Sequence, residues 1–242
     1  MSKEEEDPLK VSVLVTTYNH APYLRRCLNS LLSQSLDESL YEVVVIDDGS
    51  TDETPIILSE FKDRVRLYSQ TNQGLVKSCN KGFKLCKGTY VVRVDSDDLA
   101  GTDLLLHESC VLDLNPDVEF VVSDRIEVEA SRQNRATVNL TNIFSLIACG
   151  AMFRRDGLLS IGGYRFLFWE EYDLFIRILQ RGSGYRVDQS LYFYYRHGGN
   201  MTDDRLDRER GWKDLIDRWG IETLRKFGYC EELERVWSCR HK

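Results

Sequence analysis

The N-terminal half of the chain alternates short apolar, β-branched runs with segments in which leucines and other apolar residues recur at helical spacing. The apolar runs are continuous rather than alternating, which is typical of parallel strands whose two faces are both covered by helices. The sequence therefore predicts an α/β fold with three layers and a mostly parallel central sheet. The predicted strands are 11–17, 41–50, 64–70 and 89–94, and the predicted helices are 21–34, 51–62 and 74–88.

The C-terminal half is less regular and predicts a smaller mixed part. Its expected elements are a helix at 103–115, strands at 118–124 and 125–131, an apolar segment at 146–156 entering a helix or turn, a glycine turn at 160–166, a helix at 169–182 and one or two strands within 185–199. No composition shift marks a linker. We expect a frayed tail over 1–10, one domain over 11–202 (a nucleotide-binding half, 11–98, and an acceptor half, 99–202), and a helical extension over 203–242 that packs on the domain or a partner.

Charge and composition restrict the classes of partner. The net charge of −7 argues against a nucleic-acid backbone or an anionic membrane as the main partner. No run approaches the roughly 18 apolar residues of a membrane helix, and the acidic start lacks the apolar stretch of a signal peptide. The 7 scattered cysteines fit reduced thiols. We expect a cytoplasmic protein that at most associates peripherally with the inner face of a membrane.

Polar clusters follow the first, second and fourth predicted strands: "TTYNH", "DDGST" and "DSDD". Parallel strands present their carboxyl ends at one edge of the sheet, where ligands of such sheets bind. The last cluster brings like charges together on one turn, at Asp95, Asp97 and Asp98. A divalent cation would reduce the repulsion between these carboxylates. A solvated acidic turn is the alternative. A cation there would suit a substrate that carries a diphosphate.

The other two clusters indicate a nucleotide base. Tyr18 can stack on a planar ring, Thr16 can hydrogen-bond to it, and Asp48 can accept a hydrogen bond from an imide N–H such as that of uracil. The alternative is an ordinary strand-to-helix cap beginning at Asn19. Neither cluster contains the glycine pattern of a dinucleotide-binding fingerprint or a phosphate loop.

Taken in order, several stretches resemble family 2 glycosyltransferases with the GT-A fold. They are "VSVLVTTYNHAPYLRRCLNSLLSQS", "YEVVVIDDGSTDET", "NQGLVKSCNKG", "GTYVVRVDSDD", "GAMFRRDGLLSIGGYR", "WEEYDLFIRI" and "YRHGGNM". The resemblance spans about 11–201. It implies transfer of a sugar from a nucleotide-diphosphate donor to a glycan, glycolipid or protein acceptor, with inversion at the anomeric carbon and with Mn²⁺ or Mg²⁺ as cofactor.

The resemblance also implies roles for individual residues. Glu171 matches the catalytic base, with Glu170 as the competing candidate, and Asp97 and His197 match metal-binding positions. The secondary candidates Arg93, Asp98 and Lys77 could shape the acidic turn or supply charge. The nucleotide-binding positions are matched by Thr16, Tyr18, Asn19, Asp48, Asn80 and Asp95.

The chain departs from the family pattern at three positions. Cys79 stands where many relatives have arginine, Arg93 where an apolar residue is more usual, and Glu171 where aspartate is more usual. Because alternate residues of a strand share a face, we expect Arg93 to partner the acidic turn or the diphosphate, so that Arg93→Leu weakens donor binding much more than stability.

These departures keep two other functions open. One is a module that binds a nucleotide-sugar without turnover, and the other is a sugar nucleotidyltransferase. We also consider a homo-oligomer formed through the C-terminal helices.

Overall fold

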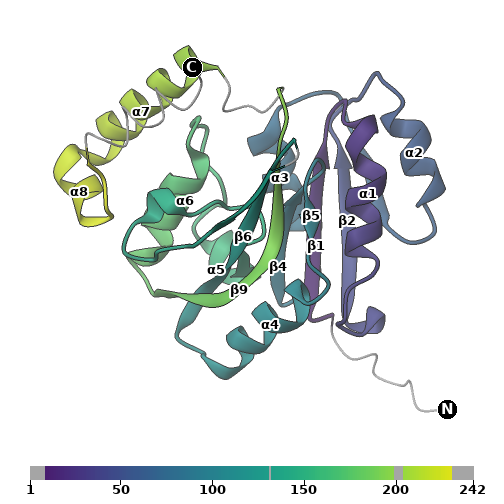
Figure 1. Ribbon diagram of the computed structural model, residues 1–242, viewed down its shortest axis with the longest axis horizontal. Coiled ribbons are helices and arrows are strands. Elements are labelled where there is room, and N and C mark those ends of the chain that lie inside the picture. Colours follow the sequence, from purple (N-terminus) through teal and green to yellow (C-terminus); the bar gives the residue numbers. More distant parts are fainter. Residues whose placement is uncertain (1–8, 131, 199–203, 231–242) are drawn as a thin grey trace.

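The computed structural model describes residues 9–130, 132–198 and 204–230, which fold around one mixed β-sheet (Figure 1). The strand order is β3-β2-β1-β4-β8-β6-β9-β5, and β7 pairs with β6 outside this path. Helices cover both faces of the sheet, so the predicted three-layer α/β architecture is confirmed.

The N-terminal half forms the parallel part of the sheet. The register places Thr16 of β1 beside Asp95 of β4, and Thr17 beside Asp47 of β2. The strands are β1 (Val11–Thr17), β2 (Tyr41–Asp47), β3 (Arg66–Ser69) and β4 (Tyr90–Asp95), connected through the helices α1 (Ala21–Leu31), α2 (Thr54–Glu60) and α3 (Leu75–Leu85) and the short 3₁₀ helix η1 (Glu38–Leu40). The four strands and three α-helices lie within the ranges that the sequence predicts, except that β4 continues to Asp95, and η1 was not predicted.

The second half continues the sheet with mixed strand directions. β8 is antiparallel to both β4 and β6, whereas the long strand β9 is parallel to β6 and antiparallel to β5. The elements are β5 (Leu99–Ala100), α4 (Leu104–Leu114), β6 (Val118–Glu129), β7 (Arg132–Ala136), η2 (Ile143–Ser145), β8 (Met152–Arg154), α5 (Arg155–Ser160), α6 (Glu170–Leu179) and β9 (Ser183–Arg196).

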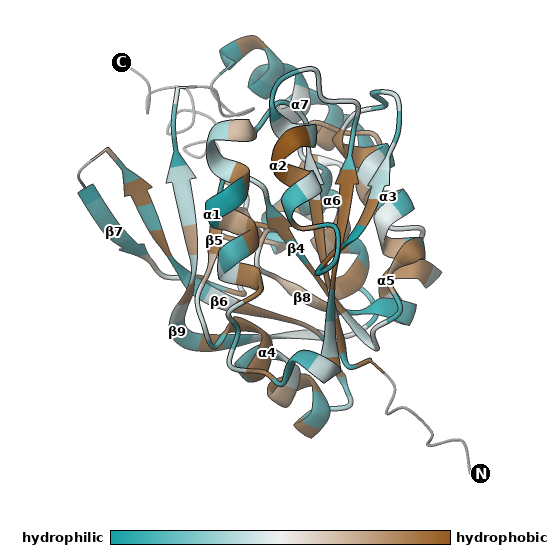
Figure 2. Cartoon of the chain, turned by 90° about the vertical axis from the view of Figure 1, so that its right-hand side faces the viewer, coloured by the Kyte–Doolittle hydropathy of each residue, from teal (hydrophilic) through white to brown (hydrophobic). Residues whose placement is uncertain are grey.

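Several predictions for this half were wrong in detail. In place of the two strands expected over 118–124 and 125–131 there is one strand, β6, which ends at Glu129, because it pairs along its length with the long strand β9. β5 and β7 were not predicted. The segment expected to enter a helix or turn contains strand β8 before α5 begins. In Figure 2 the β7 strand is mostly hydrophilic, so it lacks the apolar pattern from which a strand is predicted.

Alternate residues of β1 separate the two layers of core. Val13 and Val15 pack with the apolar faces of α1, α2 and α4, whereas Leu14 packs with residues of α3, α5 and α6 on the opposite face. The second layer also contains Trp212 of α7 (Arg205–Trp219) and Leu224 of α8 (Ile221–Lys226). These helices therefore lie on the α6 side of the sheet.

The two chain ends bear on the predicted organisation. Of the frayed tail expected over 1–10, residues 1–8 lie outside the described part of the chain, as do the expected boundary at 202 and residues 231–242. Within the described residues, none of the helices has the length and apolar character required to cross a membrane.

Candidate active site

A cavity of about 340 Å³ opens where β1, β2 and β4 end. Polar residues from these ends form one side of it, and residues 147–149 and 168–171 face them from the second half of the chain. Eight predicted site residues line it: Thr16, Tyr18, Asp48, Arg93, Asp95, Asp97, Glu170 and Glu171. The structure therefore brings residues that are far apart in the sequence into one pocket.

Arg93 forms the buried floor of the site. Its Nε and Nη2 atoms donate hydrogen bonds of 2.7 and 3.0 Å to the two carboxylate oxygens of Asp95, and Nη1 lies 3.3 Å from Glu170 Oε1. Burial alone would raise the pKa of Asp95, but the guanidinium outweighs it and leaves that pKa lowered. Arg93 thus partners the acidic turn, as expected, and also links it to the segment that carries the base candidates.

Asp97 and His197 meet at the rim of the cavity. Asp97 Oδ2 lies 2.9 Å from His197 Nε2. The backbone of Asp97 is held by Arg26 of α1, whose Nη2 donates a 2.6 Å hydrogen bond to its carbonyl oxygen. The His197 ring stacks on Tyr23 with a centroid distance of 4.6 Å. The strand β9 therefore delivers His197 to the acidic turn that follows β4.

This pair fits a hard divalent cation. Adjacent ligand atoms of an octahedral cation with bonds of about 2.1 Å lie roughly 3 Å apart, close to the Asp97–His197 separation of 2.9 Å. A carboxylate oxygen and an imidazole nitrogen both suit Mn²⁺, and the carboxylate suits Mg²⁺. The remaining positions would fall to water or substrate phosphates, since such ions seldom occupy all-protein cages.

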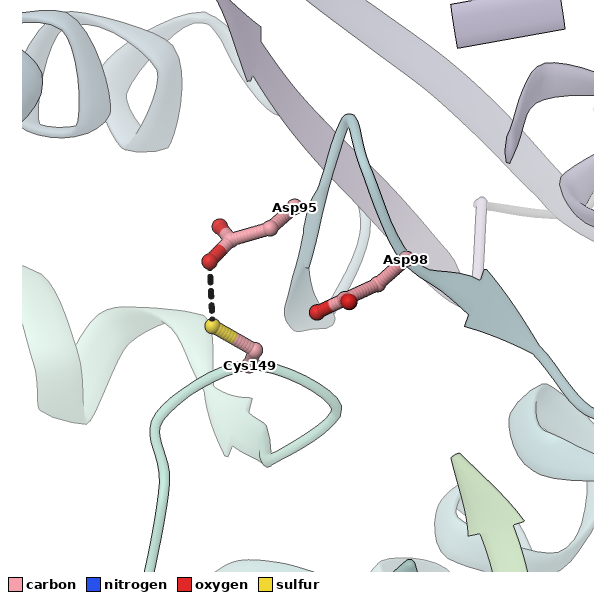
Figure 3. A group of neighbouring side chains, drawn as sticks. All are labelled: Asp95, Asp98 and Cys149. Atoms are coloured by element: carbon pink, nitrogen blue, oxygen red, sulfur yellow. Dashed lines mark hydrogen bonds between the residues drawn. The ribbon is translucent and has the colours of Figure 1, made fainter. Parts of the chain in front are cut away.

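A second acidic group, formed by Asp95, Asp98 and Cys149, fits such a cation less well (Figure 3). Asp95 already pairs with Arg93 and accepts a 2.7 Å hydrogen bond from Cys149 Sγ. Asp98 accepts hydrogen bonds of 2.7 Å from Tyr192 Oη and from the Tyr195 backbone N–H. Burial raises the pKa of the Cys149 thiol well above its usual value, so it stays protonated. Asp98 thus anchors β9 beneath the acidic turn.

The first turn of α6 places Glu170 and Glu171 on the opposite wall. Burial raises the pKa of Glu170, although Arg93 opposes the effect. Burial, followed by repulsion from Glu170, raises the pKa of Glu171 well above its usual value. A carboxyl group with a raised pKa that faces a cavity is a candidate proton acceptor.

The side of the cavity formed by the ends of β1 and β2 contains Asp48, Thr16 and Tyr18. Asp48 is 4% exposed and accepts hydrogen bonds from Gln70 Nε2 and from the backbone N–H groups of Gln73 and Gly74, at 2.7 to 2.9 Å. These bonds hold the loop before α3 in place. Tyr18 is 46% exposed, so its ring is open to a planar ligand.

The other five predicted site residues lie outside this cavity lining: Asp98 and His197, described above, and Asn19, Asn80 and Lys77. Asn19 adopts a left-handed backbone, and its side-chain oxygen accepts hydrogen bonds from the backbone N–H groups of Thr51 and Asp52. Asn80 bonds both backbone polar groups of Tyr164 at 2.8 Å. Lys77 is exposed beside the Phe166 ring. Asn19 and Asn80 therefore fix loops around the pocket.

The cavity also contains residues that the sequence reasoning missed. Cys149 lies in the apolar segment expected to enter a helix or turn, Trp169 begins the helix expected over 169–182, and Phe168 lies between the expected elements. His20 lies within "TTYNH" but was not singled out. His20 Nδ1 lies 2.7 Å from Ser96 Oγ, which connects the first polar cluster to the acidic turn. His20 could have been predicted as a cavity residue from its position after a strand end, which it shares with the other polar residues there.

We predict that Arg93→Leu lowers the free energy of unfolding by about 3 kcal/mol, because it leaves the nearly buried Glu170 and the partly buried Asp95 without their cation. This revises the expectation that donor binding suffers much more than stability. Urea unfolding measures the change. As a control, Arg25→Leu breaks the exposed pair with Glu60 and should leave the free energy of unfolding almost unchanged, because solvent screens an exposed pair. Equal losses in the two variants would contradict the role of Arg93.

The comparisons with known proteins agree with this geometry. The model of the family described as "Glycosyl transferase family 2" matches residues 12–162. The chain is 27% identical over 252 residues to the chondroitin synthase of Escherichia coli, covering 95% of this chain. It spans only 35% of the length of that relative.

Two solved structures share the fold. TarS 1–349 of S. aureus in complex with UDP-GlcNAc has a TM-score of 0.74 and 22% identity, covering 96% of this chain and 73% of that one. The mannosyltransferase PcManGT from Pyrobaculum calidifontis, in complex with GDP-Man and Mn²⁺, has a TM-score of 0.67 and 18% identity, covering 98% and 72%. The fold of this chain is thus that of glycosyltransferases solved with nucleotide-sugars.

Proposed function

Since the chain belongs to glycosyl transferase family 2, we propose that it transfers a sugar from a UDP-sugar to a hydroxyl group of a glycan, a lipid-linked saccharide or a protein, with inversion at the anomeric carbon. The observation that carries this proposal is the single cavity lined by Asp48, the Asp95–Asp97 turn and Glu171. In this proposal Asp48 would bind the base, Asp97 would bind the metal and Glu171 would accept the proton, all around one space.

The donor would lie along the ends of the parallel strands. Tyr18 would stack on the base, and Asp48, which already accepts three hydrogen bonds, retains lone-pair capacity for an imide N–H. Asp97 and His197 would hold Mn²⁺ or Mg²⁺ beside the diphosphate. When bound, such an ion neutralises charge that develops on a departing diphosphate.

Glu171 would act on the acceptor. It faces the cavity from α6, across from the acidic turn on β4, so an acceptor between them would present its hydroxyl to Glu171 and attack the sugar from the face away from the diphosphate. Glu171 would take the hydroxyl proton as the new bond forms. One displacement of this kind inverts the anomeric carbon and forms no covalent enzyme intermediate. Arg93 would keep Asp95 ionised throughout.

The test is a donor panel with metal removal. UDP-, GDP- and dTDP-sugars are incubated with the protein and Mn²⁺, with and without excess EDTA, and release of the nucleoside diphosphate is measured. We expect one donor to be cleaved and EDTA to lower the rate at least 100-fold, with recovery when Mn²⁺ is restored. Cleavage that is indifferent to EDTA would overturn the metal assignment. If UDP binds tightly but no donor is cleaved, even when candidate acceptors are added, the result would favour a non-catalytic binding module.

A further inference from the structure

Helix α7 lies beyond the matched family region and packs against the segment that enters α6 (Figure 1). Gly211 of α7 is buried in this contact. A Cβ atom added there would lie 2.7 Å from Cβ and 2.8 Å from Cδ1 of Phe168. Phe168 itself lines the cavity, two residues before Glu170. Only a glycine lets α7 approach this wall so closely.

Aromatic packing extends the same contact. The Trp212 ring lies 5.5 Å from that of Trp169 and 6.0 Å from that of Tyr172, measured between centroids. These two residues flank Glu170 and Glu171 in the sequence, and both are nearly fully buried. The α7 surface thus contacts both sides of the acidic pair, and large rigid rings limit how far that pair can move.

A hydrogen bond joins the end of α7 to the same turn of α6. Trp219 Nε1 donates to Asp173 Oδ1 at 3.1 Å. Asp173 is fully buried and also pairs with Arg177, so the bond reaches a fixed point of α6. Gly211, Trp212 and Trp219 therefore hold the start of α6 from one side, independently of the nucleotide-binding strands.

We propose that α7 is a positioning element of the active site, whose contact at Gly211 sets the place of Glu171 in the cavity. This inference rests on the proposed function for its catalytic consequence. Gly211 does not reach the cavity itself; it acts through Phe168 and Trp169. The donor side, formed by the ends of β1, β2 and β4, receives none of these α7 contacts.

The structure predicts the effect of adding a side-chain atom at position 211. The atoms that a Cβ at position 211 would meet belong to the root of the Phe168 side chain, which cannot swing away as a flexible end could. Either Phe168 or α7 must shift, and the wall before Glu171 opens to water. The charged groups that bear on Glu171 are Glu170 on α6 and Arg93 on β4, and the buried face of α7 carries Arg208. Added water would lower the pKa of Glu171 toward its ordinary value.

The test compares Gly211→Ala with Gly157→Ala. Gly157 is also helical, but the one close contact of its added Cβ would be with the flexible end of the Glu119 side chain, at 2.7 Å, and Gly157 does not line the cavity. For Gly211→Ala we expect kcat for donor cleavage to fall at least tenfold, UDP affinity with Mn²⁺ to stay within about twofold, and the acid limb of the pH profile to move to lower pH. Gly157→Ala should match the unmodified protein in all three.

A second variant and a second measurement separate positioning from simple loss of folding. Trp219→Phe removes the hydrogen bond to Asp173 but keeps an aromatic ring, and it should change kcat in the same direction by a smaller factor. The Glu171 carboxyl is also titrated directly by ¹³C NMR, with its signal assigned by its absence in Glu171→Gln. A lowered pKa of Glu171 in Gly211→Ala supports the positioning role of α7 even if no donor is cleaved. Absence of donor cleavage would instead count against the proposed function. An unchanged pKa, or equal losses of kcat and UDP affinity, overturns the positioning role.

Discussion

Glu171→Gln is expected to lower the rate of sugar transfer about 10³-fold while leaving UDP affinity within about twofold. Glutamine keeps the shape of the side chain but cannot accept a proton, and general-base catalysis contributes about 10²–10⁴ in rate. Glu171 lies on the α6 side of the cavity and not on the strand ends where we propose that the nucleotide binds, so donor binding should not depend on its charge. Initial rates and a UDP titration measure the two quantities.

Glu170→Gln is the matched neighbour for this experiment. Glu170 is bonded to Arg93 and its charge raises the pKa of Glu171, so its loss should lower that pKa. A carboxylate base works only above its pKa, so the acid limb of the transfer rate should move to lower pH in Glu170→Gln and disappear in Glu171→Gln. If Glu170→Gln abolishes transfer and Glu171→Gln retains it, the base is Glu170.

The parallel half of the fold was predictable mainly because β1, β2 and β4 each contain a largely apolar run. β3 is shorter and less apolar, and it lies within the strand predicted over 64–70. β7, with the sequence "RQNRA", and β5, with two residues, carry no such pattern. Their pairing is set by long-range contacts with β6 and β9, which a local pattern does not encode.

The candidate site was predictable to the extent that its residues follow strand ends. Asp48, Asp95 and Asp97 were recognised in this way, and all three line the cavity. Asn19 and Asn80 are in the expected segments, but their amide groups satisfy nearby backbone. Phe168 and Gly211 lie 43 positions apart in the sequence, and no local sequence pattern predicts their contact. Wall residues of this kind emerge only from packing between the halves of the chain.

The second prediction with a large expected effect concerns the Asp97 carboxylate. Asp97→Ala should lower donor cleavage about 10³-fold, which corresponds to about 4 kcal/mol of transition-state stabilisation, a size usual for a metal that offsets leaving-group charge. His197 would remain stacked on Tyr23, so the imidazole alone would stay at the rim. One neutral ligand holds Mn²⁺ far more weakly than a carboxylate with an imidazole.

The decisive measurement is the effect of Mn²⁺ on UDP binding, since it does not depend on turnover. In the unmodified protein Mn²⁺ should raise UDP affinity, whereas in Asp97→Ala it should have no effect, and UDP affinity without metal should be the same in both. Asp156→Ala removes a carboxylate whose side chain is 97% exposed on α5 and serves as the control for general loss of negative charge. A normal response to Mn²⁺ in Asp97→Ala would move the metal to other residues, the first candidates being Asp95, Asp98 and Cys149, whose ligand atoms lie within 4.8 Å of one another.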